Sequence, residues 1–325
     1  MFRARANPVG LLVFKPRPLK RAYTTSYQPI SPRPIRLLGP TLWSVAACST
    51  LYLGCAAYEV YQDARRANET GTHWSRKKTA PTFEDLQGLR DRASANATLN
   101  RLSSSTHELS EFTDPGYVTK STMAVTAAIH LASSFVPTMK YHFAHIPAQS
   151  PNYTLLTSVF GHAGLLHLAF NLYGMFMLMP SACISPTLEG SSAHLAAFYA
   201  SAGILSSLAS QVTAVWPGGT AYTAGLGASG ALFALFGVVG VSFPNTQVGI
   251  IFLPGSISIT EAMACLALFD AIGIFVRYPY LSLGHAPHLA GLALGFAYAK
   301  QNGGKNIWRP GRRVAFKAMR SLRVI

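Results

Sequence analysis

The chain has 325 residues, of which 50% are hydrophobic and only 12% are charged, whereas an average soluble domain has about 25% charged residues. This composition predicts a membrane protein. The net charge of +15 arises from Lys and Arg before residue 37 and after residue 299, outside the apolar segments, which argues against nucleic-acid binding because that requires a basic face on the folded domain. Only Glu189, Glu261 and Asp270 follow Asp114 as acidic residues, so a mechanism that needs several acids is nearly excluded there.

The first 36 residues have the composition of a mitochondrial presequence. Residues 1–36 contain eight Lys or Arg and no acidic residue, mixed with small, hydroxylated and apolar side chains. Arg21 stands three positions before Thr24, a spacing similar to the site of the matrix processing peptidase, which predicts Thr24 as an early mature N-terminus. A basic tail of a bacterial or plasma-membrane protein is the alternative. We therefore predict a multi-pass protein of the mitochondrial inner membrane.

Seven apolar stretches come close to the roughly 20 residues that a helix needs to cross the hydrocarbon core. Residues 37–58 predict an N-terminal transmembrane anchor, and residues 59–119 predict a polar linker that is partly helical around 83–92. Six further helices are predicted within 120–301, and a basic tail follows at 302–325. Their expected spans are 121–137, 159–180, 191–213, 224–243, 259–277 and 285–301. Because unpaired backbone in lipid is costly, we expect an all-α polytopic membrane protein, a six-helix bundle with one additional N-terminal transmembrane helix.

Polar residues inside such spans are costly and tend to mark function, and the first cluster surrounds a serine. Ser229 lies between Gly227 and Gly230 at the start of an apolar segment. Small neighbours allow a second helix and a substrate backbone to approach the serine closely. Taken alone, this motif is also common where helices simply pack together, so it favours a nucleophile only in combination with other residues.

A second cluster contains a histidine above two glycines. His288, Gly291 and Gly295 occupy positions i, i+3 and i+7 and therefore share one stripe of a helix. The glycines allow this helix to press against another backbone, which could bring the imidazole within reach of a serine. A histidine among apolar residues is otherwise often a hydrogen-bonded core residue, and that alternative stays open for the motif alone.

The third cluster combines two histidines with an asparagine. His167 and Asn171 are four residues apart and lie on one helical face, with His162 shortly before them. Both His167 and Asn171 can donate hydrogen bonds toward a common point. An oxyanion needs such donors fixed in advance in a medium of low dielectric constant. Alone, the pair could equally bond to a neighbouring helix.

Together, the three motifs resemble the rhomboid intramembrane serine proteases, and the surrounding residues are similar to the mitochondrial, presenilin-associated branch. The resemblance covers about residues 120–301, and the isolated first span matches the one-plus-six arrangement of that branch. It implies Ser229 as the nucleophile and His288 as the general base of a serine endopeptidase. It also implies an oxyanion site and a set of packing glycines. The oxyanion donors would be His167, Asn171 and the Ser229 N–H with His162 in support, and the packing glycines are Gly227, Gly230, Gly291 and Gly295.

The chain departs from that branch around the histidines, where Gly284 and Pro287 replace the usual Asp and Ala, and Ala290 replaces a Gly. Proline is tolerated in the first turn of a helix, so catalysis remains compatible with these changes. Asp270 is the one carboxylate on a nearby span. The scarcity of acids disfavours a Ser-His-Asp triad, and Asp270 is left with two possible roles: it orients a catalytic group or it makes a structural hydrogen bond.

Two other classes of function stay open. A metal-dependent membrane enzyme is suggested by the ten histidines, but the chain has no HExxH motif and almost no carboxylate ligands, so we expect no metal and no cofactor. A non-enzymatic relative that binds membrane clients is the second alternative. The expected partners are single-span transmembrane substrates and membrane lipid, without nucleic acid, and the resemblance suggests clients such as a dynamin-like fusion GTPase or an imported kinase.

Overall fold

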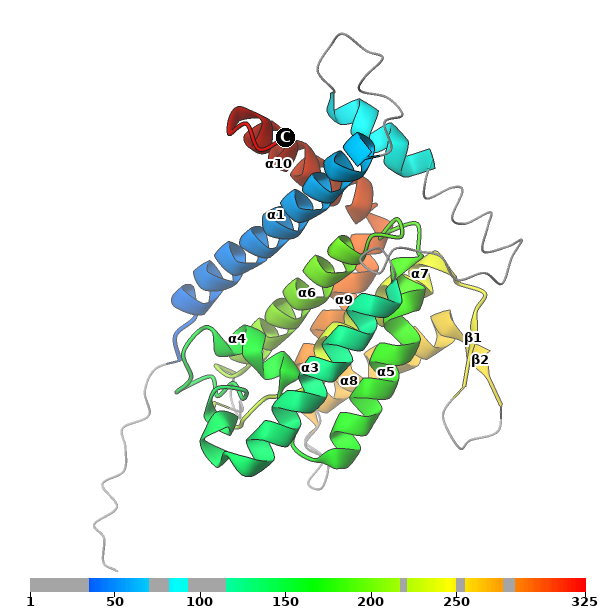
Figure 1. The fold of residues 1–325 in the computed structure, drawn as a ribbon. Coiled ribbons are helices and arrows are strands. Elements are labelled where there is room, and N and C mark those ends of the chain that lie inside the picture. The colour runs from blue at the N-terminus through cyan, green and yellow to red at the C-terminus, as the bar shows by residue number, and fades with distance from the viewer. Residues whose placement is uncertain (1–34, 70–81, 93–114, 217–220, 250–254, 277–283) are drawn as a thin grey trace, which may run out of the picture. The chain divides into compact units, whose positions relative to one another are not determined.

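The structure, a computed structural model, describes residues 35–69, 82–92, 115–216, 221–249, 255–276 and 284–325. Most of these residues are helical (Figure 1). The longer helices are α1 (Leu38–Glu69), α3 (Pro115–Phe135), α5 (Leu165–Cys183), α6 (Ser192–Thr213), α7 (Ser229–Ser242), α8 (Ile259–Phe275), α9 (His285–Lys300) and α10 (Arg309–Ser321). A further helix covers residues 83–92. The predicted presequence, apart from residues 35 and 36, lies outside the described residues.

Shorter elements connect these helices. Between α3 and α5 lie the 3-10 turn η1 (Pro137–Tyr141), the single-turn helix α4 (Thr154–Thr157) and the 3-10 turn η2 (Ser158–Phe160), and a π-helical turn, η3 (Gly304–Trp308), precedes α10. Strands β1 (Gln247–Val248) and β2 (Ile257–Ser258) pair antiparallel, with Gln247 opposite Ser258. The helical prediction therefore holds for the described residues, apart from this two-residue strand pair.

Two of the described helices, α5 and α6, are both long and apolar enough to cross a membrane by length and composition. Helix α7 is also apolar but has only 14 residues. All seven predicted spans coincide with a helix, and the agreement is close for α6 and α9. How many of the helices cross a bilayer stays a prediction.

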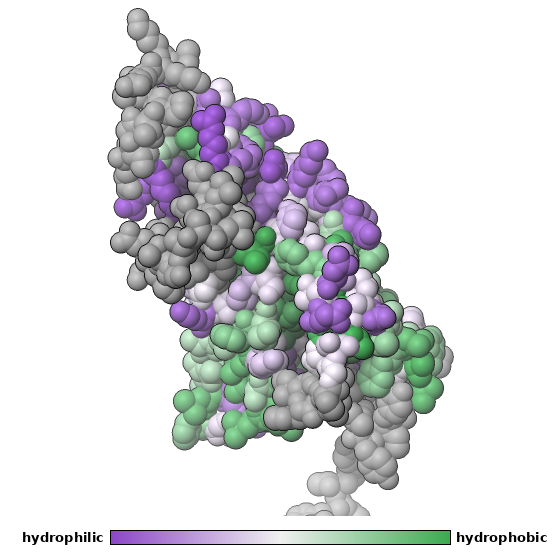
Figure 2. Space-filling view, turned by 90° about the vertical axis from the view of Figure 1, so that its right-hand side faces the viewer, coloured by the Kyte–Doolittle hydropathy of each residue, from purple (hydrophilic) through white to green (hydrophobic). Residues whose placement is uncertain are grey.

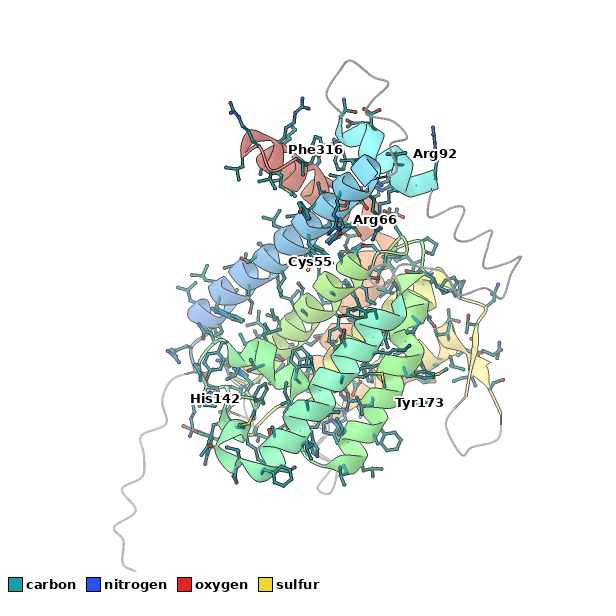
Figure 3. All side chains as sticks on the ribbon, viewed as in Figure 1. Cys55, Arg66, Arg92, His142, Tyr173 and Phe316 are labelled. Carbon is teal, nitrogen blue, oxygen red and sulfur yellow. The ribbon has the colours of Figure 1, made fainter. Side chains whose placement is uncertain are left out.

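The outer surface of the bundle is apolar where α5 lies. Its side chains Leu165, Leu166 and Phe176 are between 62% and 76% exposed, and Tyr173 points away from the neighbouring helices (Figure 3). In the space-filling view, hydrophobic side chains gather over the lower part of the molecule and hydrophilic ones over the upper part (Figure 2). Such an apolar belt is the surface that a helix presents to lipid rather than to water.

Helix α7 lies at the centre of the bundle and packs against α5, α6, α8 and α9. Its contact with α9 is a contact between backbones. A Cβ at Gly237 would lie 2.7 Å from the carbonyl oxygen of Leu292 and 2.8 Å from the amide nitrogen of Phe296, and a Cβ at Gly295 would overlap the carbonyl of Ala234. Glycines on both helices therefore allow an approach that any side chain would prevent.

A buried ion network joins the end of α1 to the helix over 83–92 and to α10. The guanidinium of Arg312, which is 1% exposed, lies 3.0 Å from Glu59 and 2.5 Å from Asp63. Arg90 lies 2.7 Å from Glu59 and 3.3 Å from Asp63. Gln87 accepts a further hydrogen bond from Arg312. Two carboxylates and two guanidinium groups thus compensate each other out of water, as buried charges must.

This network corrects one predicted boundary and shows that the predicted basic tail is structured. The linker was expected to begin at residue 59, but α1 continues to Glu69 because the charges of Glu59 and Asp63 are paired rather than solvated. The segment at 302–325 was predicted only as a basic tail, and it contains η3 and α10, with Arg312 and Phe316 buried against this assembly. Figure 3 shows Phe316 on α10 beside the end of α1.

Replacement of Arg312 with alanine is expected to destabilise the fold, because it removes one of the two guanidinium groups that pair with Glu59 and Asp63. The loss should be about 3 kcal/mol, the lower end for breaking a buried ion pair, and should appear as a lower melting temperature of the purified protein. Arg313→Ala is the matched control, since Arg313 and its partner Glu84 are 56% and 69% exposed and such pairs contribute roughly 0–1 kcal/mol. Equal melting temperatures for the two variants would contradict a stabilising network.

Candidate active site

The close approach of α7 and α9 determines which side chains meet at their ends. Ser229 is the first residue of α7, and His288 lies in the first turn of α9. One turn further along α9, a Cβ at Gly291 would overlap the carbonyl oxygen of Gly230. On its other side, a Cβ at Gly230 would lie 2.6 Å from the Cβ of Ser206 on α6. The two helices therefore touch through glycine backbone directly beside the serine and the histidine.

Ser229 and His288 lie within hydrogen-bond distance. The Oγ of Ser229 is 2.8 Å from the Nε2 of His288. The imidazole stacks on the ring of Phe233, one turn into α7, with centroids 4.4 Å apart and planes 7° from parallel. The ring therefore has little freedom to turn, and its Nε2 is held toward the hydroxyl, which is the geometry of a nucleophile beside its base.

The segment before Ser229 has no side chain where a reacting group would need space. Gly227 has a φ of +126°, a backbone conformation that favours glycine. A Cβ at this position would lie 2.9 Å from the Nε2 of His167 and 3.9 Å from the Oγ of Ser229. The space that a Cβ of residue 227 would occupy thus lies between the Nε2 of His167 and the hydroxyl of Ser229. The amide nitrogen of Ala163 donates a long hydrogen bond of 3.5 Å to the Nδ1 of His167, which favours the tautomer whose proton is on Nε2, facing this space.

Asn171 lies one turn after His167 on α5 and is 4% exposed. Its Nδ2 donates one hydrogen bond to the carbonyl of His167 over 2.8 Å, which leaves the second N–H of the amide for another acceptor. Asn171, His167 and Ser229 line the same cavity. The N-terminus of α7 adds a partial positive charge at Ser229. The predicted donors therefore line the cavity into which Ser229 opens.

His162 lies before the first residue of α5 and supports His167 rather than facing Ser229. The rings of His162 and His167 are 5.0 Å apart, and the Nδ1 of His162 is 3.3 Å from the carbonyl of Phe160. His162 is 7% exposed, so its ring is buried beside His167.

The loop that leads to Ser229 is bonded to the segment between η1 and α4. His145 and Gly225 exchange two backbone hydrogen bonds of 2.8 Å each, and the amide of Gly227 donates to the carbonyl of Ser158 over 2.9 Å. The buried ring of His145 is itself fixed between Thr154 at 2.7 Å and Gln211 at 2.9 Å. Nothing in the sequence indicated this role for His145, because its partners Gly225 and Gln211 are far away in the chain.

Asp270 on α8 lies next to both histidines of α9. Its Oδ1 is 2.8 Å from the Nδ1 of His285 and 3.5 Å from the Nδ1 of His288. The scarcity of acids had argued against an acid at the catalytic base, yet the structure brings the carboxylate to it. The sequence signal was present, since Asp270 lies well inside the predicted span 259–277, whereas Glu261 lies at its start.

These residues line a cavity of about 1340 Å³ bounded by α5, α6, α7, α8 and α9. Apolar side chains such as Phe170, Phe236 and Leu266 form part of its wall. Ser229 and His288 both line this cavity. Among the described residues, no three histidine, cysteine or carboxylate side chains converge as ligands for a metal ion.

Comparison with known proteins identifies one family and a group of relatives. Residues 149–302 match the rhomboid domain. The chain is 31% identical over 177 residues to the mitochondrial presenilin-associated rhomboid-like proteins of Rattus norvegicus, Mus musculus and Homo sapiens. Each match covers 53% of this chain and 44% of the relative. The chain thus spans less than half of the length of these relatives. The rhomboid match over 149–302 includes Ser229, His288 and Asp270 but not His145.

Proposed function

Because the chain carries a rhomboid domain over residues 149–302, we propose that it is an intramembrane serine endopeptidase that cleaves transmembrane segments with Ser229 and His288. The observation that carries the proposal is the 2.8 Å distance between the Oγ of Ser229 and the Nε2 of His288. A serine hydroxyl is a weak nucleophile by itself and becomes effective when an adjacent base accepts its proton.

The first half of the reaction forms an acyl-enzyme. His288 Nε2 takes the proton of Ser229 as the Oγ attacks the carbonyl carbon of the scissile peptide bond. The negative charge that develops on the carbonyl oxygen is stabilised by the Nε2–H of His167, the free amide N–H of Asn171 and the backbone N–H of Ser229. When the C–N bond breaks, His288 returns the proton to the leaving amine, and the ester to Ser229 remains.

The second half hydrolyses that ester. A water molecule gives a proton to His288 while its oxygen attacks the acyl carbon, and the tetrahedral intermediate is held by the same donors. Collapse of the intermediate releases the carboxyl product, and the proton on His288 returns to Ser229. The site must therefore admit water as well as substrate, and the cavity around Ser229 supports this requirement.

The substrates that we propose are single-span membrane proteins. A peptide bond inside a regular helix is shielded by its neighbours, so the client helix must unwind near the cut before its carbonyl can reach Ser229. We infer residence in the mitochondrial inner membrane, as a multi-pass protein in contact with lipid. The basic, acid-free residues 1–36 and the mitochondrial location in the names of the relatives support this location.

Labelling with a fluorophosphonate tests the proposal against a non-enzymatic relative that only binds clients. The purified protein is expected to react at a single serine, mapped by mass spectrometry to Ser229, and His288→Ala should slow the reaction strongly because the base is lost. A chelator should leave the labelling rate unchanged, which separates this mechanism from a metal-dependent one. Absence of labelling at Ser229 in the folded protein would overturn the proposal.

A further inference from the structure

The carboxylate of Asp270 is 1% exposed and is therefore shielded from bulk water. Of the three acidic residues after Asp114, Glu189 binds Arg309 and Glu261 closes a capping box with Ser258 at the start of α8. Asp270 instead faces two imidazole rings. Its Oδ1 lies 2.8 Å from the Nδ1 of His285 and 3.5 Å from the Nδ1 of His288. A buried acid needs such partners, and here one of the two partners is the catalytic base.

The packing between α8 and α9 is shaped to hold this arrangement. A Cβ at Gly273, one turn after Asp270, would overlap the ring of His285. Glycine at this position therefore admits the imidazole against α8. Phe269 contacts the same ring edge to face, with centroids 5.3 Å apart. The ring of His285 is thus held against α8. Its 2.8 Å hydrogen bond to Asp270 fixes the orientation of that carboxylate.

We propose that Asp270 is a positioning residue for His288. This role rests on the proposed protease function. His288 can accept the proton of Ser229 only if its Nε2 is unprotonated at rest, so the neutral ring must carry its proton on Nδ1. That proton faces the Oδ1 of Asp270. The carboxylate favours this tautomer, and when the ring takes the second proton during catalysis the negative charge of Asp270 stabilises the imidazolium.

The distance of 3.5 Å between Asp270 Oδ1 and His288 Nδ1 is longer than an ordinary N–H···O hydrogen bond. The carboxylate therefore acts on the resting ring mainly through its charge, and a small shift of the ring completes the hydrogen bond once the imidazolium forms. The other titratable groups that interact with His288 or share its turn are His167 on α5 and His285 on α9. Neither carries a negative charge, so within the described part of the chain Asp270 is the group that supplies one beside His288.

A merely structural role for Asp270 would make different predictions. If the carboxylate served only to tie α8 to α9 through His285, then removal of either partner would loosen the helices and reduce activity to a similar extent. Its charge would then have no influence on the pH at which His288 works. The pH profile of the reaction therefore separates the two roles.

The experiment compares Asp270→Asn, Asp270→Glu and His285→Gln in the full-length protein in liposomes, using cleavage of a single-span reporter and fluorophosphonate labelling of Ser229. Asp270→Asn is expected to lower kcat roughly 100-fold, the lower end of what a positioned base contributes, with KM within about twofold since the client contacts are unchanged. In the pH profile of kcat/KM, the acid limb should move to lower pH, because the imidazolium of His288 loses the carboxylate that stabilises it. Asp270→Glu should recover most of kcat and the original limb.

Cys265→Ser, at an exposed position of α8, is the matched control and should behave as the wild type. Melting temperatures identify any variant that fails to fold, and Asp270→Glu carries the test if Asp270→Asn does not fold. An unchanged acid limb in Asp270→Asn, or equal losses in Asp270→Asn and His285→Gln, would overturn the positioning role. Failure of the wild type to label at Ser229 would instead refute the proposed function, so the two failures are distinguishable.

Discussion

Replacement of Ser229 with alanine is expected to abolish cleavage of a single-span reporter, with a fall in kcat on the order of 10⁶-fold, as for loss of a serine nucleophile from a unit that works together with its base. The expected cause is specific. The Oγ of Ser229 is the atom 2.8 Å from the Nε2 of His288, and alanine removes this atom without adding volume. The measurement is the single-turnover rate of reporter cleavage in liposomes of the full-length protein.

The matched control for this change is Ser181→Ala. Ser181 lies on α5, where its hydroxyl donates to the carbonyl of Met177 within the same helix, and it does not line the cavity around Ser229. Its loss should leave cleavage unchanged. Both variants should melt at nearly the same temperature as the wild type. Cleavage by a folded Ser229→Ala protein at the wild-type rate would remove this serine from the mechanism.

Replacement of Gly291 with alanine is expected to have the second largest effect. The added methyl group would overlap the carbonyl oxygen of Gly230 and approach the Oγ of Ser206 to 3.1 Å. Because both obstacles belong to packed helices, α7 and α9 must separate. A displacement of about 1 Å between nucleophile and base costs roughly 100-fold in rate, and the overpacked interface should lose about 1–3 kcal/mol of stability. Reporter cleavage and the melting temperature measure the two effects.

Gly54→Ala serves as the control for the change from glycine to alanine in a helix. Gly54 lies within α1, and a Cβ at this position would have no atom within 4 Å. The change should stabilise the helix by up to about 1 kcal/mol, because alanine has the higher helix propensity. Wild-type activity of Gly291→Ala would show that the contact between the glycines does not determine the distance between Ser229 and His288.

The helical segments could be predicted from the sequence because apolar length and turn residues act locally. The span expected at 191–213 corresponds to α6 at Ser192–Thr213, and the one expected at 285–301 corresponds to α9 at His285–Lys300. The largest difference is at α1, which continues to Glu69. Glu59 and Asp63 look solvated in the sequence, and their partner Arg312 is more than 240 residues away, so no local pattern reveals the pairing.

The candidate site was predictable only in part. The resemblance supplied Ser229 and His288, and the periodicity of Gly291 and Gly295 indicated which face of α9 could approach another helix. The place of Asp270 could not be derived, because it depends on how α8 packs against α9 and on the missing side chain of Gly273. The same holds for His145, whose contacts with Gly225 and Gln211 join segments far apart in the chain.

The shortness of α7 has a consequence for where clients are cut. A helix of 14 residues rises about 21 Å at 1.5 Å per residue, whereas the hydrocarbon core is about 30 Å thick. If Ser242 were level with one face of that core, the hydroxyl of Ser229 would lie about 9 Å below the other face. Products are then expected to be asymmetric, with one fragment retaining most of the client's hydrophobic segment and the other only about six residues of it.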